Sequence, residues 1–186
     1  MKIIATVLLS TTLALAVQAQ FLTEATNVAP TKIETLESAT NAIIVRGIGT
    51  AGSLTAGPGL LTLQLKESLN VDTNVKLLGL QLDYAQGNFH QRMLIDYDEL
   101  SPLLTAMDYI QKVNHDVTQL PNFEVVFRTK SGFQVIGIGN QRQTAVQIFM
   151  KVGDDERIPV NSTQLSQLRT LIAQCQVALD ALREAK

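Results

Sequence analysis

RMLIDYDELSPLLT, residues 92–105, recurs 65 positions later as RIPVNSTQLSQLRT at residues 157–170. The two stretches share an arginine, two leucines, a serine and a threonine, and pairs such as Met with Ile or Asp with Asn keep similar chemistry. A repeat at a fixed offset indicates a fold built from copies of one supersecondary unit. The sequence therefore predicts two related units, and each unit can be followed outward from its copy of this stretch.

Both copies lead into a predicted helix. Apolar residues recur at steps of three and four, which places them on one face of an α-helix. Asn114 interrupts this stripe in the first copy, whereas the second copy continues to Leu182. Residues that favour N-caps precede both helices, namely Asp96 or Asp98 in the first and residues 161–163 in the second. The apolar positions are Leu100, Leu103, Met107 and Ile110 in the first copy, and Leu165, Leu168, Ile172, Cys175, Leu179 and Leu182 in the second.

Four short apolar runs, separated by turns rich in Gly, Asn and Asp, precede each predicted helix. We therefore predict an α+β fold, a tandem repeat of a four-stranded antiparallel sheet followed by one helix, with the helices packed on the sheets or on each other. The two units, 41–117 and 118–186, are expected to form one compact domain. This order of elements is similar to the Whirly and transcriptional-coactivator single-stranded-DNA folds, a likeness of topology that no motif residue carries. The expected strands are 42–46, 60–66, 76–84 and 92–95, then 123–128, 133–138, 144–152 and 157–160.

The N-terminus has the pattern of a cleavable signal peptide. Lys2 precedes an apolar run at residues 3–17, and the segment 1–19 ends on small Ala19, so cleavage is expected between Ala19 and Gln20. The run is shorter than the roughly 20 residues that a membrane-spanning helix needs. We therefore expect a secreted or periplasmic protein with no stable membrane span after processing. Residues 20–40, rich in Thr, Ala and Glu, are expected to form a flexible or weakly helical lead-in.

Composition excludes several functional classes. The chain is 46% hydrophobic and 17% charged, which is incompatible with a disordered acidic protein. A net charge of −2 argues against nucleic-acid binding through bulk positive charge. The densest basic group, Arg128, Lys130 and Arg142, could face one side of the second sheet. Cys175 is the only cysteine, so an internal disulfide and a cysteine-cluster metal site are both excluded.

A glycine-rich stretch, GIGTAG at residues 47–52, matches the G-x-G-x-x-G pattern of dinucleotide-binding loops. Those loops require a helix to begin at the third glycine, because its N-terminus holds the pyrophosphate. The sequence Gly57-Pro58-Gly59 follows too closely for such a helix. We therefore expect this stretch to be a flexible loop or the edge of a strand.

Two groups of carboxylates could in principle hold Ca²⁺ through oxygen ligands. Neither group has the spacing of a known calcium loop. Helix capping accounts for the first group and a solvated turn for the second. The groups are Asp96, Asp98 and Glu99, and Asp154, Asp155 and Glu156.

Other reactive side chains also have ordinary structural interpretations. His90 lies beside a predicted turn and His115 follows the first helix, where a cation suits the negative end of the helix dipole. We expect surface or helix-capping roles for both. Cys175 lies within the apolar stripe, so we expect it to pack in the core and to be a poor nucleophile.

No catalytic, cofactor-binding or metal-binding motif is apparent, and we predict no catalytic residues, cofactor or metal. The favoured hypothesis is an exported, soluble, non-enzymatic binding or structural module that contacts an unknown protein or envelope component. The alternative is a carrier of a small apolar ligand held between sheet and helices. The regular helix stripes also allow a homodimer.

Overall fold

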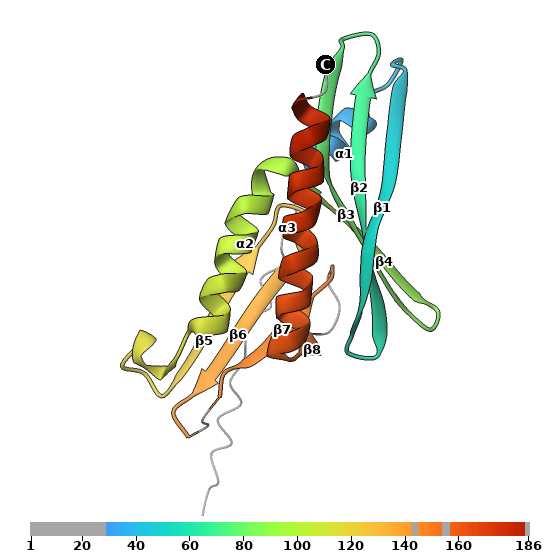
Figure 1. Ribbon diagram of the computed structural model, residues 1–186. Coiled ribbons are helices and arrows are strands. Elements are labelled where there is room, and N and C mark those ends of the chain that lie inside the picture. Colours follow the sequence, from blue (N-terminus) through green and yellow to red (C-terminus); the bar gives the residue numbers. More distant parts are fainter. Residues whose placement is uncertain (1–28, 143–144, 154–156, 185–186) are drawn as a thin grey trace, which may run out of the picture.

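A computed structural model of the chain describes residues 29–142, 145–153 and 157–184. The predicted signal peptide with its cleavage point at Ala19 and Gln20, and the acidic turn 154–156, lie outside these residues. Two four-stranded antiparallel sheets each precede a long helix, which confirms the predicted α+β class and order of elements (Figure 1). We call β1–β4 sheet A and β5–β8 sheet B. The bounds are β1 Ile44–Ala56, β2 Gly59–Asn70, β3 Val75–Gln86, β4 Phe89–Asp96, α2 Tyr97–Lys112, β5 Asn122–Arg128, β6 Gln134–Asn140, β7 Gln147–Lys151, β8 Ile158–Val160 and α3 Ser162–Glu184.

Each long helix packs against the sheet of the other half. α3 follows sheet B but lies along β1, β2 and β3 of sheet A, and α2 follows sheet A but also covers β5 and β6. The two helices lie side by side (Figure 1). Arg169 joins them, since its Nε and Nη2 donate to the carboxylate of Asp108 at 2.7 and 2.9 Å. Neither half could bury its apolar sheet face without the other. Within the described part of the chain, no helix has both the length and the apolar character needed to cross a membrane.

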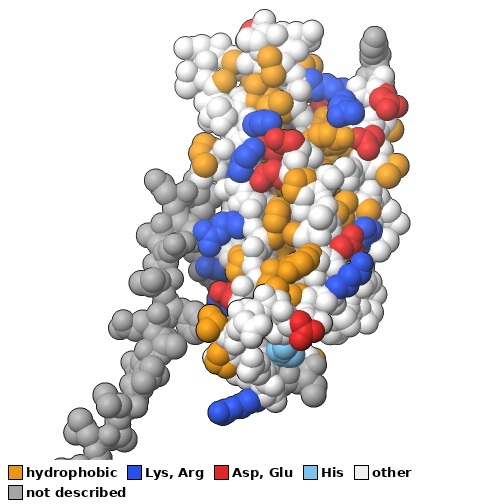
Figure 2. Space-filling model, turned by 90° about the vertical axis from the view of Figure 1, so that its left-hand side faces the viewer, with side chains coloured by type: hydrophobic (Ala, Val, Ile, Leu, Met, Phe, Trp, Pro, Cys, Tyr) orange, Lys and Arg blue, Asp and Glu red, His pale blue; other side chains and the backbone are white. Residues whose placement is uncertain are grey.

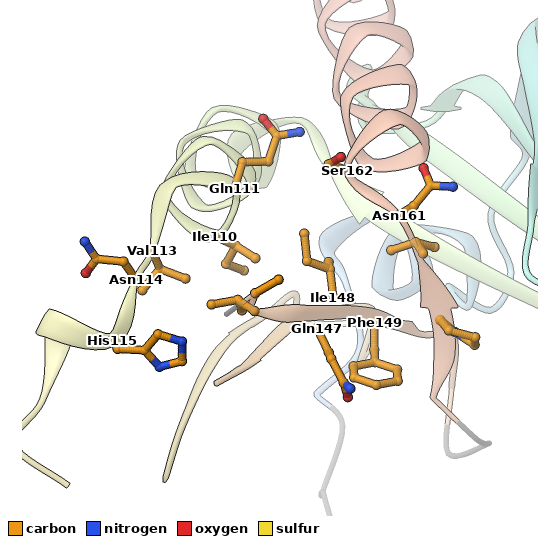
Figure 3. Close-up of a pocket in the computed structure, with 14 residues that line it drawn as sticks. Ile110, Gln111, Val113, Asn114, His115, Gln147, Ile148, Phe149, Asn161 and Ser162 are labelled. Carbon is orange, nitrogen blue, oxygen red and sulfur yellow. The ribbon is translucent and has the colours of Figure 1, made fainter. Parts of the chain in front are cut away.

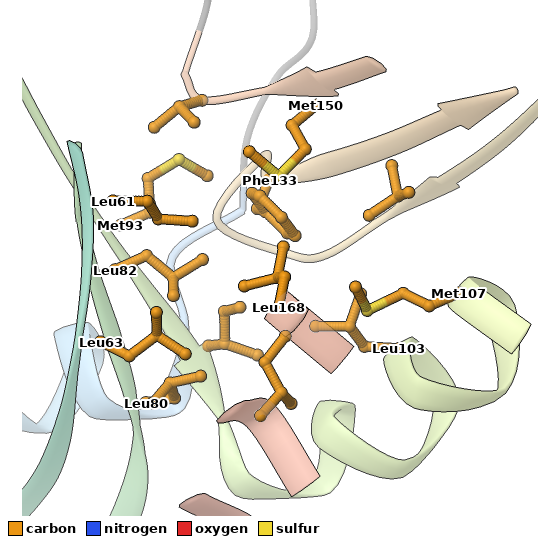
Figure 4. Close-up of a cluster of buried hydrophobic side chains, with 14 of the residues drawn as sticks. Leu61, Leu63, Leu80, Leu82, Met93, Leu103, Met107, Phe133, Met150 and Leu168 are labelled. Carbon is orange, nitrogen blue, oxygen red and sulfur yellow. The ribbon is translucent and has the colours of Figure 1, made fainter. Parts of the chain in front are cut away.

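The repeated apolar stripe forms the centre of the core. Its members on α2 and α3 point between the two sheets, towards leucines of sheet A and towards Phe133 and Met150 at sheet B (Figure 4). The members from Leu100 to Ile110 and from Leu165 to Leu179 are at most 1% exposed, so removing one large side chain would cost roughly 2–5 kcal/mol. Leu182, which was also expected in the stripe, is 38% exposed, because it lies in the last turn of α3. The buried pairs at the 65-residue offset are Leu100 and Leu165, Leu103 and Leu168, Met107 and Ile172, and Ile110 and Cys175.

The glycine-rich stretch continues β1 instead of interrupting it. β1 pairs with β2 from Ile44 opposite Asn70 to Ala56 opposite Gly59, with one bulge between Thr50 and Gly52. The strand was therefore expected to end too early, because glycine weakens a strand but still makes the ladder hydrogen bonds. The stretch is thus neither a flexible loop nor the end of a strand but part of β1, which is the edge strand of sheet A.

The lead-in contains a short helix, α1 (Lys32–Glu37), on the face of sheet A opposite α3. Thr31 begins it, because its side chain accepts from the Glu34 N–H while the Glu34 carboxylate accepts from the Thr31 N–H. Ile33 is fully buried above Gly79 of β3, where any side chain on the strand would collide with it. Close packing at this one position therefore holds α1 on the sheet.

Candidate functional site

A groove of about 770 Å³ lies at the end of the molecule where α2 stops and α3 begins (Figure 3). One wall is the last turn of α2 with the residues that follow it, and the opposite wall is the junction between β8 and α3. β7 forms the floor, with Ile148 directed between the walls (Figure 3). The groove thus lies between sheet B and both long helices.

The groove exists because α2 ends early. The C-cap residue of α2, Val113, has an extended backbone with φ −62° and ψ 138°. The next residue, Asn114, is the one that interrupts the apolar stripe of the first copy. The side chain of Asn114 then accepts a hydrogen bond from the Asp116 N–H and begins a short 3-10 turn, His115–Val117. A side chain that bonds the backbone locally in this way competes with the helix and stops it.

His115 is the least expected side chain of the groove. Its ring meets Phe123 edge-on, with ring centroids 5.7 Å apart. Both ring nitrogens are inaccessible to solvent, and neither has a hydrogen-bond partner among the described residues. Of the two expected roles, helix capping is therefore wrong, because ring nitrogens without hydrogen bonds do not cap a helix. The residue as a whole remains partly exposed. A buried polar group without a partner requires a specific explanation.

The opposite wall is fixed by neutral hydrogen bonds. The Gln164 N–H donates to Asn161 Oδ1 at 2.8 Å, and the Asn161 N–H donates to Gln164 Oε1 at 2.9 Å, which caps α3 reciprocally. Gln164 Nε2 also donates to the carbonyl of Thr55 in β1. Between the walls, Gln111 Nε2 donates to Ser166 Oγ at 2.8 Å. The two helix ends are thereby held at a set separation.

None of the 14 lining residues is Asp, Glu, Lys or Arg, and His115 is the only titratable one among them. Apolar side chains predominate near the floor, and amides, a hydroxyl and the imidazole supply the polar groups. Such a surface suits a ligand with an apolar body and one or more neutral hydrogen-bonding groups. The lining residues are Ile110, Gln111, Val113, Asn114, His115, Ala145, Val146, Gln147, Ile148, Phe149, Pro159, Val160, Asn161 and Ser162.

A second, more open groove of about 570 Å³ separates α2 from β5. Pro102, Ala106 and Tyr109 of the helix face Val125 and Phe127 of the strand across it. On the face drawn in Figure 2, hydrophobic side chains form a band down the middle, with most charged side chains at its flanks. The part of the surface that carries α2 is therefore rich in accessible apolar area.

The acidic group before α2 has a structural role. Asp96 is 2% exposed, and its carboxylate accepts from the backbone N–H groups of Lys32 and Ile33 at the start of α1. The Glu99 carboxylate accepts from the Asp96 N–H. Asp98 accepts from Lys32 Nζ at 2.9 Å, and this hydrogen bond lowers the pKa of the Asp98 carboxyl below its ordinary value. These carboxylates join α1 to α2, as the helix-capping interpretation expects.

The remaining candidates are dispersed. His90 is exposed on β4. Lys130 lies beside Asp96, 3.4 Å from its Oδ2, whereas Arg142 follows the opposite end of β6, so the expected basic group does not assemble on one face. Burial raises the pKa of the Cys175 thiol to about 11, consistent with its expected place in the core. Among the residues the structure describes, no three His, Cys, Asp or Glu side chains gather in a way that could hold a metal ion.

The sequence contained one signal for this groove that the motif search missed. Asn114 breaks the first stripe at the position where the second copy has Leu179, and His115 follows it directly. A break in one copy of a repeat marks a place where the two copies differ in structure.

Comparisons with family models, curated proteins and solved structures find no match to this chain.

Proposed function

We propose that this chain is an exported, non-enzymatic binding module whose binding site is the groove at His115. The observation that carries the proposal is an uncharged, largely apolar groove containing an imidazole whose two nitrogens are enclosed and unpartnered. Because both nitrogens are enclosed, a ligand hydroxyl, amide or carbonyl would bond one of them once the His115 ring turns towards the groove, and the apolar part of the ligand would cover the aliphatic floor.

The non-enzymatic part of the proposal rests on what the titratable groups already do. The Asp96 carboxylate accepts a hydrogen bond from the Lys32 N–H at the start of α1, and the Asp98 carboxylate accepts one from Lys32 Nζ. The raised pKa of Cys175 disfavours its nucleophilic thiolate at neutral pH. Among the described residues, no carboxylate is paired with His115 to orient it as a general base.

The export part rests on the pattern of Lys2, the apolar run at residues 3–17 and Ala19. N-terminal sequencing of the protein recovered outside the cytoplasm is expected to begin at Gln20. Recovery of a chain that still begins at Met1 would contradict export by a cleaved signal peptide.

We further propose that the two halves are copies of one duplicated unit. Support comes from the matching stretches 92–105 and 157–170, and from the stripe residues that are buried at the same offset in α2 and α3. In this view both copies kept the core positions, while the first copy lost the end of its helix and thereby opened the groove.

A fluorescent probe tests the binding site directly. N-phenyl-1-naphthylamine is neutral and apolar, carries one N–H donor, and brightens when it leaves water. We expect the mature protein to bind it and His115→Ala to weaken binding by about tenfold, the effect of losing one hydrogen bond in an apolar site. His90→Ala is the matched control, because His90 is exposed on β4, and it is expected to bind normally. Equal binding by both variants, or no binding by the mature protein, would contradict the proposal.

The alternative function, a carrier of a small apolar ligand, is favoured by the position of the same groove between sheet B and the two helices. Native mass spectrometry of the protein purified gently from its exported compartment distinguishes the two. A carrier is expected to retain a small-molecule mass that His115→Ala loses, whereas a module for a macromolecular partner is expected to be bare.

A further inference from the structure

The four sheet edges differ in how they are protected. An edge strand presents unpaired N–H and C=O groups, and proteins usually guard it with charges, proline or short length. β4 carries His90 and Arg92, and β5 carries Glu124 and Arg128. β8 has only three residues, one of them Pro159. These three edges therefore have the usual protection.

β1 lacks this protection. It has 13 residues with a single charge, Arg46, whose Nε lies 3.0 Å from the Glu37 carboxylate of α1. Val45 and Ile48 are 51% and 58% exposed. Figure 1 shows β1 at the outer side of sheet A, with only β2 beside it along its upper half.

The free part of this edge is Ile44–Thr50. Beyond it the bulge between Thr50 and Gly52 breaks the regular register. β8 then lies beside the end of β1. The packing is close there, since a Cβ on Gly57, the residue after β1, would come within 2.8 Å of Ile158 in β8. Seven regular residues remain, which span about 23 Å at roughly 3.3 Å per residue.

α3 lies over the second half of β1 with uncharged side chains. Gln164 bonds to Thr55, and Leu171, seven residues later, packs over Gly52, three residues earlier in the strand. Beyond Leu171 the helix leaves β1 and runs towards β3, where Lys76 Nζ donates to the carbonyl of Leu182. The free part of β1 is therefore not covered by α3 (Figure 1).

Three of the four charged side chains of α3 contact α2, and the fourth, Glu184, is exposed at the last residue of the helix. Arg169 bonds to Asp108 of α2, Asp180 accepts from the Tyr97 hydroxyl, and Arg183 lies over the Tyr97 ring. The surface formed by the free part of β1 therefore has one charge, Arg46, and that charge is already paired with Glu37.

We propose that this surface binds a second copy of the chain, with β1 pairing antiparallel to its counterpart about a two-fold axis near Ile48. The two sheets A would join into one continuous sheet, with both α3 helices on the same face of it. A second copy fits the charge pattern, because this register sets Arg46 opposite Thr50 and leaves no acidic or basic side chain without its partner. The interaction is independent of the His115 groove.

Sedimentation velocity of the mature protein, residues 20–186, tests the proposal. We expect a concentration-dependent dimer, and Ile48→Lys is expected to weaken dimerisation by at least about tenfold, because two lysines would meet at the axis. Val126→Lys is the matched control, since Val126 is a 45% exposed residue on the edge strand of sheet B. A wild-type monomer at all concentrations, or dimers unaffected by Ile48→Lys, would overturn the proposal.

Cross-linking tests the register separately. Cys175 is buried, so a cysteine introduced at position 48 would be the only accessible thiol. A short bismaleimide is expected to link Ile48→Cys into covalent dimers and to leave Val126→Cys monomeric. Efficient linking of Val126→Cys but not of Ile48→Cys would place the interface at β5 and overturn the proposal. Binding of N-phenyl-1-naphthylamine by each variant, measured in parallel, reports on the groove alone.

Discussion

The long helices α2 and α3 carry the same buried stripe but end differently. Ile110 and Cys175 occupy equivalent positions, and both are buried. One helical turn later α3 continues with buried Leu179 up the face of sheet A, whereas α2 stops before Asn114. The shared positions build the core, and the groove forms where the two copies part. In a protein with an internal repeat, positions where the two copies differ, such as Asn114 and Leu179, are therefore the places to look for a functional site.

The starts of the two helices differ in charge but share geometry. Asp96 and Asn161 occupy the same position of the repeat, and each N–H donates to the side chain three residues later. The Asp96 carboxylate is buried against α1, where it accepts from the first N–H groups of that helix and lies near Lys130. The neutral version bonds back to its own helix and lines the groove. The charged residue Asp96 at the start of α2 therefore attaches α1 to the rest of the fold. The neutral residue Asn161 at the start of α3 leaves the groove without a charge.

Removing the two side chains should give unequal losses of stability. Asp96→Ala deletes a buried acceptor of two backbone N–H groups and is expected to lower the free energy of unfolding by about 3 kcal/mol. Asn161→Ala removes one helix cap and is expected to cost about 1 kcal/mol. Urea unfolding followed by circular dichroism measures both. Equal losses would show that the carboxylate does not join α1 to α2 as described.

Replacing a sheet glycine by alanine should cost more stability in sheet A than in sheet B. A Cβ on Gly79 would collide with the carbonyl oxygen of Ile95 and with Ile33, so Gly79→Ala is expected to cost about 2 kcal/mol. In sheet B, a Cβ on Gly137 would lie 3.3 Å from Ile110 Cγ2, a contact that small shifts can relieve. Gly137→Ala is therefore expected to cost less than about 1 kcal/mol. Thermal unfolding of the two variants side by side provides the test, and the reverse order would contradict the packing of α1 on Gly79.

Prediction from sequence succeeded where the signal was periodic and failed where it depended on tertiary contacts. The stripes at residues 100–110 and 165–182 predicted two helices with a buried face, because apolar spacing alone identifies a packed face, and only Leu182 at the end of the second stripe is exposed. The glycines of residues 47–52 concealed the length of β1, since their strand conformation depends on pairing with β2. The enclosure of the two His115 ring nitrogens could not be predicted, because it depends on tertiary contacts such as the edge-on packing of the ring against Phe123.

The dependence of stability on pH should also come mainly from the first half. Burial works to raise the pKa of Glu37, but hydrogen bonds from Ser68 and Lys66 outweigh it, and the pKa lies below its ordinary value of 4.5. A carboxyl group of this kind adds stability above pH 4.5 and loses that contribution as the pH falls through the lower, folded-state pKa. Glu37→Gln is expected to cost about 1.5 kcal/mol at pH 7 and much less at acidic pH. Urea titrations at several pH values check this, and a constant difference would contradict it.

The smallest effect is expected at Cys175, because its equivalent in the first copy, Ile110, shows that the position needs only apolar volume. Cys175→Val should change the free energy of unfolding by less than about 1 kcal/mol. The thiol, with a pKa raised to about 11 by burial, should resist iodoacetamide at pH 8 in the folded protein and react once urea unfolds it. Mass spectrometry of the alkylated chain measures this directly. Rapid labelling of the native protein would mean that the α3 stripe opens at this point, and the two copies would then differ in their cores as well as at their ends.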